Sequence, residues 1–410
     1  MAGEWRTLPA RDFCGSVRDG THDSPKPVSQ GRYLVTSRHI VGGRVDLTNA
    51  YLISQDDFDA VNKRSKVDKW DVLVSMIGTV GEPCLVKEEP DFAIKNVGLF
   101  KSKGESEGKF LYYYLSSPKA RQMIREQSRG TTQPYIPLEA LRDFPIDVPT
   151  DPNEQRAIAH ILGTLDDKIE LNRRMNETLE AMAQALFKNW FVDFEPFRDQ
   201  GMEDSPLGPI PKGWRVGILG DIADNQHRGI HPKDIDPSTP YIGLEHMPRK
   251  CIGLSEWGHA KELESNKFRF KKGEFLFGKL RPYFHKVGVA PLDGVCSTDI
   301  LVIAPKEPAC FGFALGHISS TEFVAYTDAG STGTKMPRTN WQDMACYKIV
   351  IPPQPLAESF NEVICPLVDK IIGNIHQSHT LASIRDTLLP KLLSGEIRVK
   401  DAERFAEQAA

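Results

Sequence analysis

The feature that most restricts the fold of this chain is an internal repeat. When the 410-residue sequence is compared with itself, one register dominates, in which Gly130 falls on Gly333, an offset of 203. Identical pairs in this register include Ser128 with Ser331, Thr131 with Thr334, and Pro134 with Pro337. After one deletion the offset becomes 202, and Asp167 and Asn172 meet Asp369 and Asn374. Similarity over this length favours two copies of one unit over two unrelated domains.

Each copy mixes strands with helices. Short runs rich in Val, Ile and Phe, bounded by Gly, Pro and Asp, predict strands at VLVSMI, AIKNVGLF and FPIDV in the first copy and EFLFGKL, TDILVIA and YKIVI in the second. Between them, FLYYYLSSPKARQMIREQ and FALGHISSTEFVAYTD have helical length and spacing. The expected fold class is therefore α+β, with two tandem mixed α/β domains.

A long amphipathic helix is predicted after each copy, beginning beyond the proline-rich boundaries VPTDP and IPPQP. Apolar residues recur in alternating steps of four and three, which is the coiled-coil period. The expected seam comprises Leu162, Leu165, Ile169, Asn172, Leu179 and Leu186 in the first helix and Ile364, Leu367, Ile371, Asn374, Leu381 and Leu388 in the second. An Asn at the same place in both stripes is typical of a device that sets register.

We expect these two helices to pair as an antiparallel coiled coil, which would relate the two domains by a pseudo-two-fold axis. About 33 residues of helix would make a rod of about 50 Å. The alternative is that each helix packs only on its own domain. The predicted boundaries are 1–150 for the first domain, 151–200 for the central helical spacer, 201–352 for the second domain, 353–400 for the C-terminal helical spacer and 401–410 for a tail.

The charge is unevenly divided along the chain. The net charge is −4, but residues 151–204 hold six Lys and Arg against twelve Asp and Glu, whereas the globular segments are mildly basic. This favours local phosphate-binding patches over nonspecific coating of DNA. No apolar run of about 18 residues occurs, and the start MAGEWRTLPA lacks the apolar stretch of a signal peptide, so a cytoplasmic location is expected.

The candidate DNA-contacting residues lie mostly in polar, basic segments at matching places of the two copies. They are Thr21, His22, Lys26, Arg38, His39, Arg121, Arg125, Arg129, Thr131, Thr132, Gln133 and Tyr135 in the first copy, and Arg228, His231, Lys279, Arg281, Tyr283, Thr332, Thr334, Lys335 and Arg338 in the second. The segments QSRGTTQPY and GSTGTKMPR occupy one place in the repeat but carry different polar side chains, as two readers of different sequences should. A solvated basic face is the alternative.

Catalysis and metal binding are not expected. Pro90, Asp91, Glu107 and Lys109 imitate a nuclease signature, but that signature needs its second acid and lysine on a strand, whereas SKGESEGKF is predicted to be a loop. No phosphate-binding loop, nucleophile elbow or adenine methyltransferase motif is present. The seven cysteines are scattered and never spaced CxxC, and HRGIH lacks a carboxylate at ligand spacing.

Several segments together resemble the DNA-specificity subunit of type I restriction-modification systems. They are DGTHDSPKP, PNEQRAIAHILGTLDDKI, NWFVDFEPF before PLGPIPKGW, IPPQPLAESFNEV and LLPKLLSGEI, and the resemblance covers nearly the whole chain. The second helix departs from the pattern, with AESFNEV where an EQ pair is expected.

The resemblance implies a non-catalytic subunit whose two target-recognition domains read the halves of a bipartite site on double-stranded DNA. It further implies two methyltransferase subunits docked on the helices, at the exposed faces of 154–195 and 356–395, and restriction subunits with translocase activity. S-adenosylmethionine, ATP and Mg would then be bound by those partners and not by this chain. The competing hypotheses are a transcription regulator with a duplicated DNA-reading domain and a coiled-coil scaffold that never contacts DNA.

Overall fold

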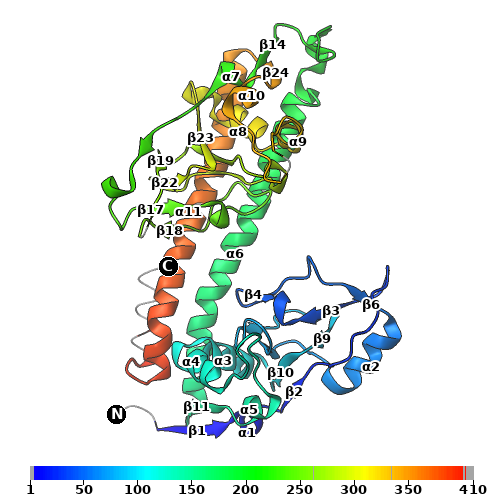
Figure 1. Cartoon of the computed structure of the whole chain (residues 1–410), viewed down its shortest axis with the longest axis vertical. Helices are drawn as coiled ribbons and strands as arrows, with labels where there is room; N and C mark the ends of the chain where they lie inside the picture. The colour runs from blue at the N-terminus through cyan, green and yellow to red at the C-terminus, as the bar shows by residue number, and fades with distance from the viewer. Residues whose placement is uncertain (1–3, 262, 334, 400–401, 403–410) are drawn as a thin grey trace. The chain divides into compact units, whose positions relative to one another are not determined.

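The computed structural model describes residues 4–261, 263–333, 335–399 and 402 (Figure 1). The chain divides into two compact units. Unit 1 comprises Met1–Ile169 and Thr380–Ala410, and unit 2 comprises Glu170–His379. The two long helices, α6 (Pro152–Phe191) and α11 (Gln354–Leu393), each contribute one part to each unit.

Unit 1 is built on a four-stranded antiparallel sheet with the order β2 (Ser16–Asp19), β10 (Val97–Lys101), β7 (Val72–Ser75) and β8 (Pro83–Leu85). A second sheet has the order β6 (Leu52–Ile53), β3 (Arg32–Thr36) and β9 (Phe92–Lys95), with β3 and β9 parallel. Two-stranded pairs join β1 (Trp5–Pro9) to β11 (Pro145–Pro149) and β4 (Ile40–Val41) to β5 (Arg44–Val45). The shorter helices are α1 (Ala10–Phe13), α2 (Gln55–Ser65), α3 (Glu105–Ser116), α4 (Pro118–Gln127) and α5 (Leu138–Arg142), with a 3-10 turn η1 (Ser37–His39).

Unit 2 repeats this arrangement. Its four-stranded sheet has the order β15 (Ala223–Asn225), β23 (Ile300–Pro305), β20 (Phe275–Gly278) and β21 (Val287–Val289). Its larger sheet has the order β16 (Gly229–Ile230), β19 (Lys267–Phe270), β22 (Gly294–Ser297), β17 (Pro240–Ile242) and β18 (Gly258–His259), and again contains one parallel pair, β17 with β22. Short antiparallel pairs join β14 (Arg215–Ile218) to β24 (Lys348–Ile351) and β12 (Met202–Glu203) to β13 (Ile210–Pro211). The helices are α7 (Leu219–Ile222), α8 (Phe311–Ile318), α9 (Thr321–Ala329) and α10 (Trp341–Ala345), and the 3-10 turns are η2 (Glu195–Gln200), η3 (Pro232–Asp234), η4 (Leu244–His246), η5 (Pro282–Phe284) and η6 (Pro308–Cys310).

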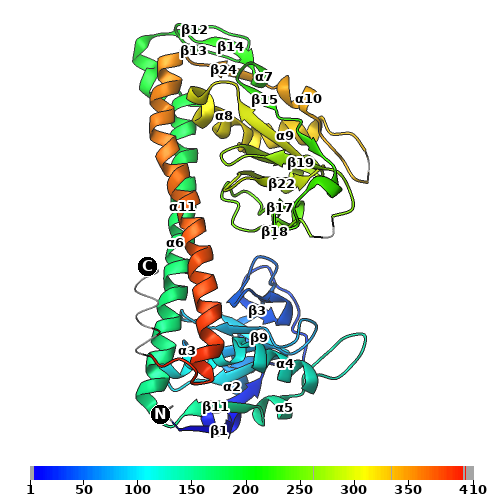
Figure 2. The same ribbon diagram turned by 90° about the vertical axis from the view of Figure 1, so that its left-hand side faces the viewer.

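The long helices run antiparallel within unit 2. Asn172 of α6 donates to Gln377 Oε1 at 2.9 Å, while Asn176, one turn later, donates to the Ile371 carbonyl at 3.3 Å. A rising residue number in α6 is thus matched by a falling number in α11, and Figure 2 shows the two segments side by side. Each helix has 40 residues, more than the roughly 33 expected from the sequence.

The expected seam residues all lie on buried or half-buried helix faces. Leu162 and Leu388 belong to the core of unit 1, where they join Phe100, Phe110 and Phe144 of the globular part. In unit 2, residues 179–191 of α6 and 360–375 of α11 share a core with the β20 strand and helix α8. The helices therefore pack both on each other and on the globular part of each unit, so the alternative that each helix packs only on its own domain was wrong.

Two local expectations were wrong. The segment SKGESEGKF is not a loop, because α3 begins at Glu105. The helix expected to run through FLYYYLSSPKARQMIREQ is broken at Ser117, whose side chain accepts a hydrogen bond from the Ala120 amide at 3.2 Å and caps α4 at its Pro118 start. Ser320 caps α9 in the same way, accepting from Phe323 at 3.1 Å. A serine cap followed by proline favours a new helix over continuation.

Within the described part of the chain, no helix is both long enough and apolar enough to cross a membrane.

Candidate functional site

A closed polar loop occupies the same place in both units. In unit 1, Arg129 and Tyr135 exchange two backbone hydrogen bonds of 2.8 Å, and in unit 2, Thr332 and Arg338 exchange two of 3.0 Å. Each loop has a glycine in the left-handed region directly after its first residue, Gly130 in unit 1 and Gly333 in unit 2. The two loops therefore share one backbone design.

Each loop is hydrogen-bonded to one connection of the four-stranded sheet in its unit, between β7 and β8 in unit 1 and between β20 and β21 in unit 2. The Gly78 amide donates to the Pro134 carbonyl at 3.0 Å, and the Arg281 amide donates to the Pro337 carbonyl at 2.8 Å. Two residues after these prolines, the Ile136 amide donates to the Met76 carbonyl and the Thr339 amide donates to the Lys279 carbonyl, each at 3.0 Å. These bonds keep the offset of 203, so the repeat seen in the sequence holds at the level of single hydrogen bonds.

The side chains on this shared backbone differ. Thr131, Thr132 and Gln133 are exposed in unit 1, whereas Lys335 and Met336 are exposed in unit 2. Thr334, also expected to contact DNA, lies outside the described residues. At equivalent positions the loops thus expose different side chains, Thr132 against Lys335 and Gln133 against Met336, as expected of surfaces that contact different base edges.

Of the basic residues at the first loop, Arg121 and Arg125 lie on α4, and Arg129 is the first residue of the loop itself. Arg125 and Arg129 are exposed, while Arg121 forms an ion pair with Glu82 at 3.5 Å. Arg121 and Arg125 also line a cavity of about 580 Å³ with Gly42 and Gly43. Arg125 and Arg129 are consequently the better candidates for a phosphate contact, because Arg121 is paired within the protein.

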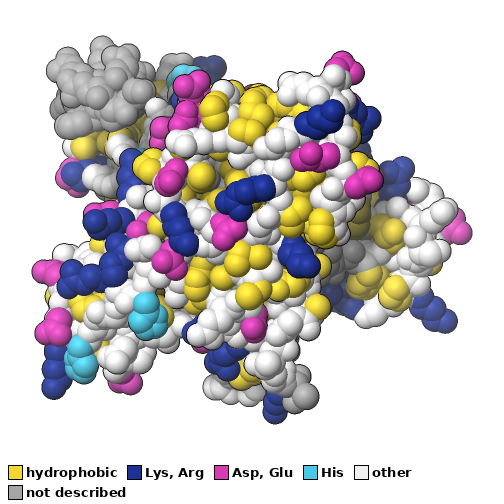
Figure 3. Space-filling model, turned by 90° about the horizontal axis from the view of Figure 1, so that it is seen from above, with side chains coloured by type: hydrophobic (Ala, Val, Ile, Leu, Met, Phe, Trp, Pro, Cys, Tyr) yellow, Lys and Arg dark blue, Asp and Glu magenta, His cyan; other side chains and the backbone are white. Residues whose placement is uncertain are grey.

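Unit 2 places its basic residues elsewhere. The α9 helix, TEFVAYTDA, corresponds to α4 but holds no Lys or Arg. Lys279 and Arg281 lie instead on the connection between β20 and β21, next to the second loop. Arg338 closes that loop and forms an ion pair with Asp299 at 3.2 Å. On the face drawn in Figure 3, lysine and arginine side chains are likewise scattered among acidic and apolar ones.

The segment DGTHDSPKP is held by a buried carboxylate. Asp19 is 3% exposed, forms an ion pair with Arg64 and lies 3.0 Å from His22 Nε2. The other ring nitrogen of His22 lies 2.7 Å from Asn96 Oδ1. Thr21 accepts the Asp23 amide at 3.1 Å and so shapes the turn. His22 remains largely exposed in this fixed orientation, and Lys26 is exposed beyond it.

Some expected contact residues have structural partners in the protein. His39 is 3% exposed and its Nδ1 accepts the Thr36 amide at 2.9 Å, so its ring is not presented at the surface as the sequence suggested, although Arg38 is exposed. Burial, together with the Arg38 charge, lowers the pKa of His39. Arg228 forms an ion pair with Glu274, and His231 Nδ1 accepts the Lys233 amide at 3.3 Å.

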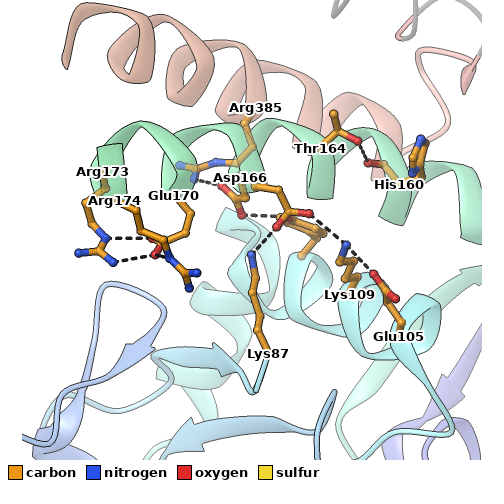
Figure 4. Close-up of polar contacts among 12 residues, drawn as sticks. Lys87, Glu105, Lys109, His160, Thr164, Asp166, Glu170, Arg173, Arg174 and Arg385 are labelled. Carbon is orange, nitrogen blue, oxygen red and sulfur yellow. Dashed lines mark hydrogen bonds and ion pairs between the residues drawn. The ribbon is translucent and has the colours of Figure 1, made fainter. Parts of the chain in front are cut away.

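A polar network that the sequence did not reveal joins α6 to the globular part of unit 1 (Figure 4). Asp166 accepts a 2.7 Å hydrogen bond from Tyr113 and pairs with Arg385 at 2.6 Å. The next residue, Asp167, pairs with Lys87 at 2.8 Å and Lys109 at 3.3 Å. Lysine charges and hydrogen bonds lower the pKa of Asp167 despite its partial burial. Adjacent acids inside an apolar stripe were the only signal for this network.

In unit 2 the corresponding attachment uses one buried carboxylate. Glu180 of α6 is 7% exposed and accepts the backbone amides of Ile252 and Gly253, each at 3.0 Å, together with the thiol of Cys251 at 3.2 Å. Burial beside this carboxylate raises the pKa of the Cys251 thiol to about 12. Glu180 is therefore a structural anchor rather than a free acid.

The outward faces of the long helices carry exposed apolar side chains. Leu171 is 51% exposed, Met182 is 47% exposed and Val363 is 43% exposed. All three lie within the ranges expected to form a partner surface.

The groups that imitate a nuclease signature are not arranged for catalysis. Glu107 and Lys109 lie on helix α3 and not on a strand, and Lys109 pairs with Glu105 at 2.9 Å. Asp91 forms an ion pair with Arg32. Among the described residues, no group of three or more His, Cys, Asp and Glu side chains could hold a metal ion.

Comparison with known proteins gives consistent results. Residues 26–181 match the family model described as the type I restriction modification DNA specificity domain. The MjaIX type I restriction enzyme specificity subunit of Methanocaldococcus jannaschii is 32% identical over 305 residues, covering 71% of this chain and 69% of the relative. The HindI specificity subunit of Haemophilus influenzae is 23% identical, covering 70% of this chain and 77% of the relative. In fold, the chain is similar to the S subunit of a type I restriction-modification system from M. genitalium, with a TM-score of 0.58 and 15% identity over 95% of this chain and 96% of that chain.

Proposed function

Because the chain belongs to the family of type I restriction-modification DNA specificity subunits, we propose that its two units read the two halves of a bipartite DNA sequence. The observation that carries this proposal is the pair of equivalent loops, Arg129–Tyr135 and Thr332–Arg338. Their backbones are held by matching hydrogen bonds, but their exposed side chains differ. A duplicated scaffold with unlike reading groups suits an asymmetric sequence read in two parts.

Phosphate contacts would come from different elements in the two units. In unit 1 we assign them to Arg125 and Arg129. We also assign them to Lys26 and His22, which follow the buried Asp19 in the sequence. In unit 2 we assign them to Lys279, Arg281 and Lys335. Such contacts position the protein on the duplex, and the polar loop residues then supply base contacts.

The helices α6 and α11 are proposed to form an antiparallel coiled coil whose outer faces dock two methyltransferase subunits, which restriction subunits join. Exposed Leu171, Met182 and Val363 support this, because apolar residues on a charged helix face gain by burial against a partner. Residues 151–204 are also acidic overall, with six Lys and Arg against twelve Asp and Glu, which suits a protein partner better than DNA.

The chain itself is proposed to be non-catalytic. In this proposal S-adenosylmethionine, ATP and Mg are bound by the partner subunits, and this chain decides where on the DNA they act.

The test is to map methylated adenines in cells that express the methyltransferase subunits with and without this chain. We expect methylation at one bipartite sequence only when the chain is present. Exchanging residues 205–352 for the matching segment of the MjaIX relative should change one half of that sequence and leave the other half unchanged. Capture of the methyltransferase subunit by the chimera provides the folding control.

An unchanged methylated sequence in a chimera that still captures its partner would contradict the proposal. A transcription regulator, the competing function, would instead bind its own site without the methyltransferase subunits and leave the methylation pattern unaltered.

A further inference from the structure

The connection between β20 and β21 in unit 2 differs sharply from its equivalent in unit 1. Residues 279–286, Lys-Leu-Arg-Pro-Tyr-Phe-His-Lys, are basic and aromatic and one residue longer than residues 76–82, Met-Ile-Gly-Thr-Val-Gly-Glu. The latter contain no Lys, Arg or aromatic residue. The two connections still enter their polar loops through matching hydrogen bonds, at Gly78 and at Arg281. The two connections therefore lie at the same place in their units and differ in their side chains.

The unit 2 connection is locked in a costly conformation. Arg281 and His285 both have φ of 51°, in the left-handed region that residues with a Cβ avoid, and they enclose the 3-10 turn η5. Arg281 is bonded to Pro337 as described above, and buried His285 Nε2 lies 2.9 Å from the Ser319 carbonyl. Strain of this kind persists only where the surrounding structure enforces it, and it is concentrated at functional sites.

The residue held out by this turn is Tyr283. Tyr283 is 50% exposed, whereas Pro282 at the start of the turn and His285 directly after it are buried. Its ring contacts Phe284 edge to face, with centroids 4.7 Å apart, and Phe284 is covered by the Arg249 guanidinium at 4.1 Å. An exposed aromatic ring is thus supported from behind by a second ring and a cation.

The surroundings of Tyr283 are cationic. Lys279 and Arg281 belong to the same connection, as does Lys286, whose ammonium group donates to the Leu244 carbonyl. Arg249 and Lys250 lie beside the connection, with Lys250 donating its backbone amide to the His285 carbonyl at 2.8 Å. An aromatic side chain on a rigid support with cations around it matches the chemistry of a nucleic-acid base flanked by phosphates.

We propose that Tyr283 stacks against a base in the half of the DNA sequence contacted by unit 2. The proposal rests on the proposed function of the chain and adds to it a residue that reads DNA through stacking at a deformed base step. The equivalent connection of unit 1, residues 76–82, has no aromatic residue, so stacking from this connection is confined to one half of the sequence.

The test is a double-mutant cycle between the tyrosine and the DNA. The full chain, assembled with its methyltransferase subunits, is titrated with duplexes that carry the mapped sequence and a single abasic position, moved one nucleotide at a time through both halves. Tyr283→Ala should weaken binding to the intact duplex by about 5- to 150-fold, the range for loss of one base–aromatic stack. At one position in one half of the sequence, removal of the base should weaken DNA binding by the wild type as much as Tyr283→Ala does. The same abasic duplex should weaken binding by the Tyr283→Ala variant little further.

Tyr283→Phe should retain wild-type affinity, because stacking needs the ring and not the hydroxyl. Val80→Ala, in the equivalent connection of unit 1, is the matched control and should show no coupling to any base. Equal affinity of Tyr283→Ala and wild type, absence of coupling at every position, or a Tyr283→Phe variant as weak as Tyr283→Ala would each overturn the proposal. A wild-type complex with no preference for the mapped sequence would instead overturn the proposed function itself.

Discussion

Asn374 of α11 donates a 2.8 Å hydrogen bond from its side-chain amide to the Oδ1 atom of Asn176 on α6. Asn374 is 2% exposed, so this bond lies inside an otherwise apolar helix pair, and its neighbour Asn172 is 1% exposed. Two buried amides with partners on the opposite helix specify one register, because a shift of either helix would leave them without hydrogen bonds.

Replacing Asn374 with Ala should therefore lower the free energy of unfolding by about 1–3 kcal/mol, the usual cost of leaving a buried polar partner unsatisfied. Urea denaturation followed by circular dichroism measures this change. Ser383→Ala, an exposed substitution on the same helix, is the control and should alter stability by less than about 0.5 kcal/mol. Equal stability of the two variants would show that the Asn374 bond contributes nothing.

The Asp166–Arg385 pair in unit 1 should behave as a coupled unit. The side chains of Asp166 and Arg385 are 15% and 27% exposed, so removing Arg385 alone leaves a poorly hydrated carboxylate. We expect Arg385→Met to destabilise by about 2–3 kcal/mol, somewhat less than for a fully buried pair because of the remaining exposure.

The double variant Asp166→Val and Arg385→Met should recover part of that loss, because it leaves no unpaired charge but deprives the buried Tyr113 hydroxyl of its acceptor. Thermal unfolding of both single variants and the double variant gives the coupling free energy. Additive effects would contradict a direct interaction.

His317 should make unit 2 sensitive to acid. Its Nε2 atom is buried and has no hydrogen-bond partner among the described residues, and burial lowers the pKa of the imidazole to about 3. Between pH 6.5 and 3 the unfolded chain binds a proton at this residue that the folded chain does not. The stabilising contribution of the neutral ring is therefore complete above about pH 6.5 and is lost as the pH falls toward 3.

At pH 5 this linkage amounts to about 2 kcal/mol. His317→Phe should remove that part of the pH dependence, measured as the difference in urea stability between pH 7.5 and pH 5. His160→Gln, an exposed histidine on α6, should leave the pH dependence as in the wild type. A His317→Phe variant with the wild-type pH dependence would show that His317 is not the residue responsible.

Arg129 should contribute one phosphate contact. Because its side chain is exposed at the mouth of the first loop, Arg129→Gln should weaken binding to all sequences and reduce the slope of log affinity against log salt by about 1. The slope is measured by fluorescence anisotropy of the assembled complex at several salt concentrations, from about 50 to about 300 mM. The control Arg156→Gln on α6 should leave the slope unchanged. A slope for Arg129→Gln equal to that of the wild type would show that Arg129 makes no phosphate contact.

Much of the architecture was predictable because it rests on patterns that are local or repeated. The offset of 203 predicted equivalent loops, and the structure has the Arg129–Tyr135 and Thr332–Arg338 bonds in that register. The apolar stripes predicted long helices with buried Asn172 and Asn374. The start of α3, residues 105–109, was missed because a segment rich in Gly and Ser has weak helix propensity, which packing of Phe110 and Leu111 into the core overrides.

The side-chain partners of the candidate site were not predictable. Nothing in the residues around position 180 indicates that Glu180 will accept hydrogen bonds from the amides of Ile252 and Gly253. Nor does the sequence indicate that the Thr36 amide donates to His39, whose ring is buried. The sequence by itself determined the duplication, the periodic faces of the helices and the family, because these depend on residue order and spacing. Only the tertiary structure decided which charged groups are bonded internally and which remain exposed, because long-range contacts between distant segments set the burial of each side chain.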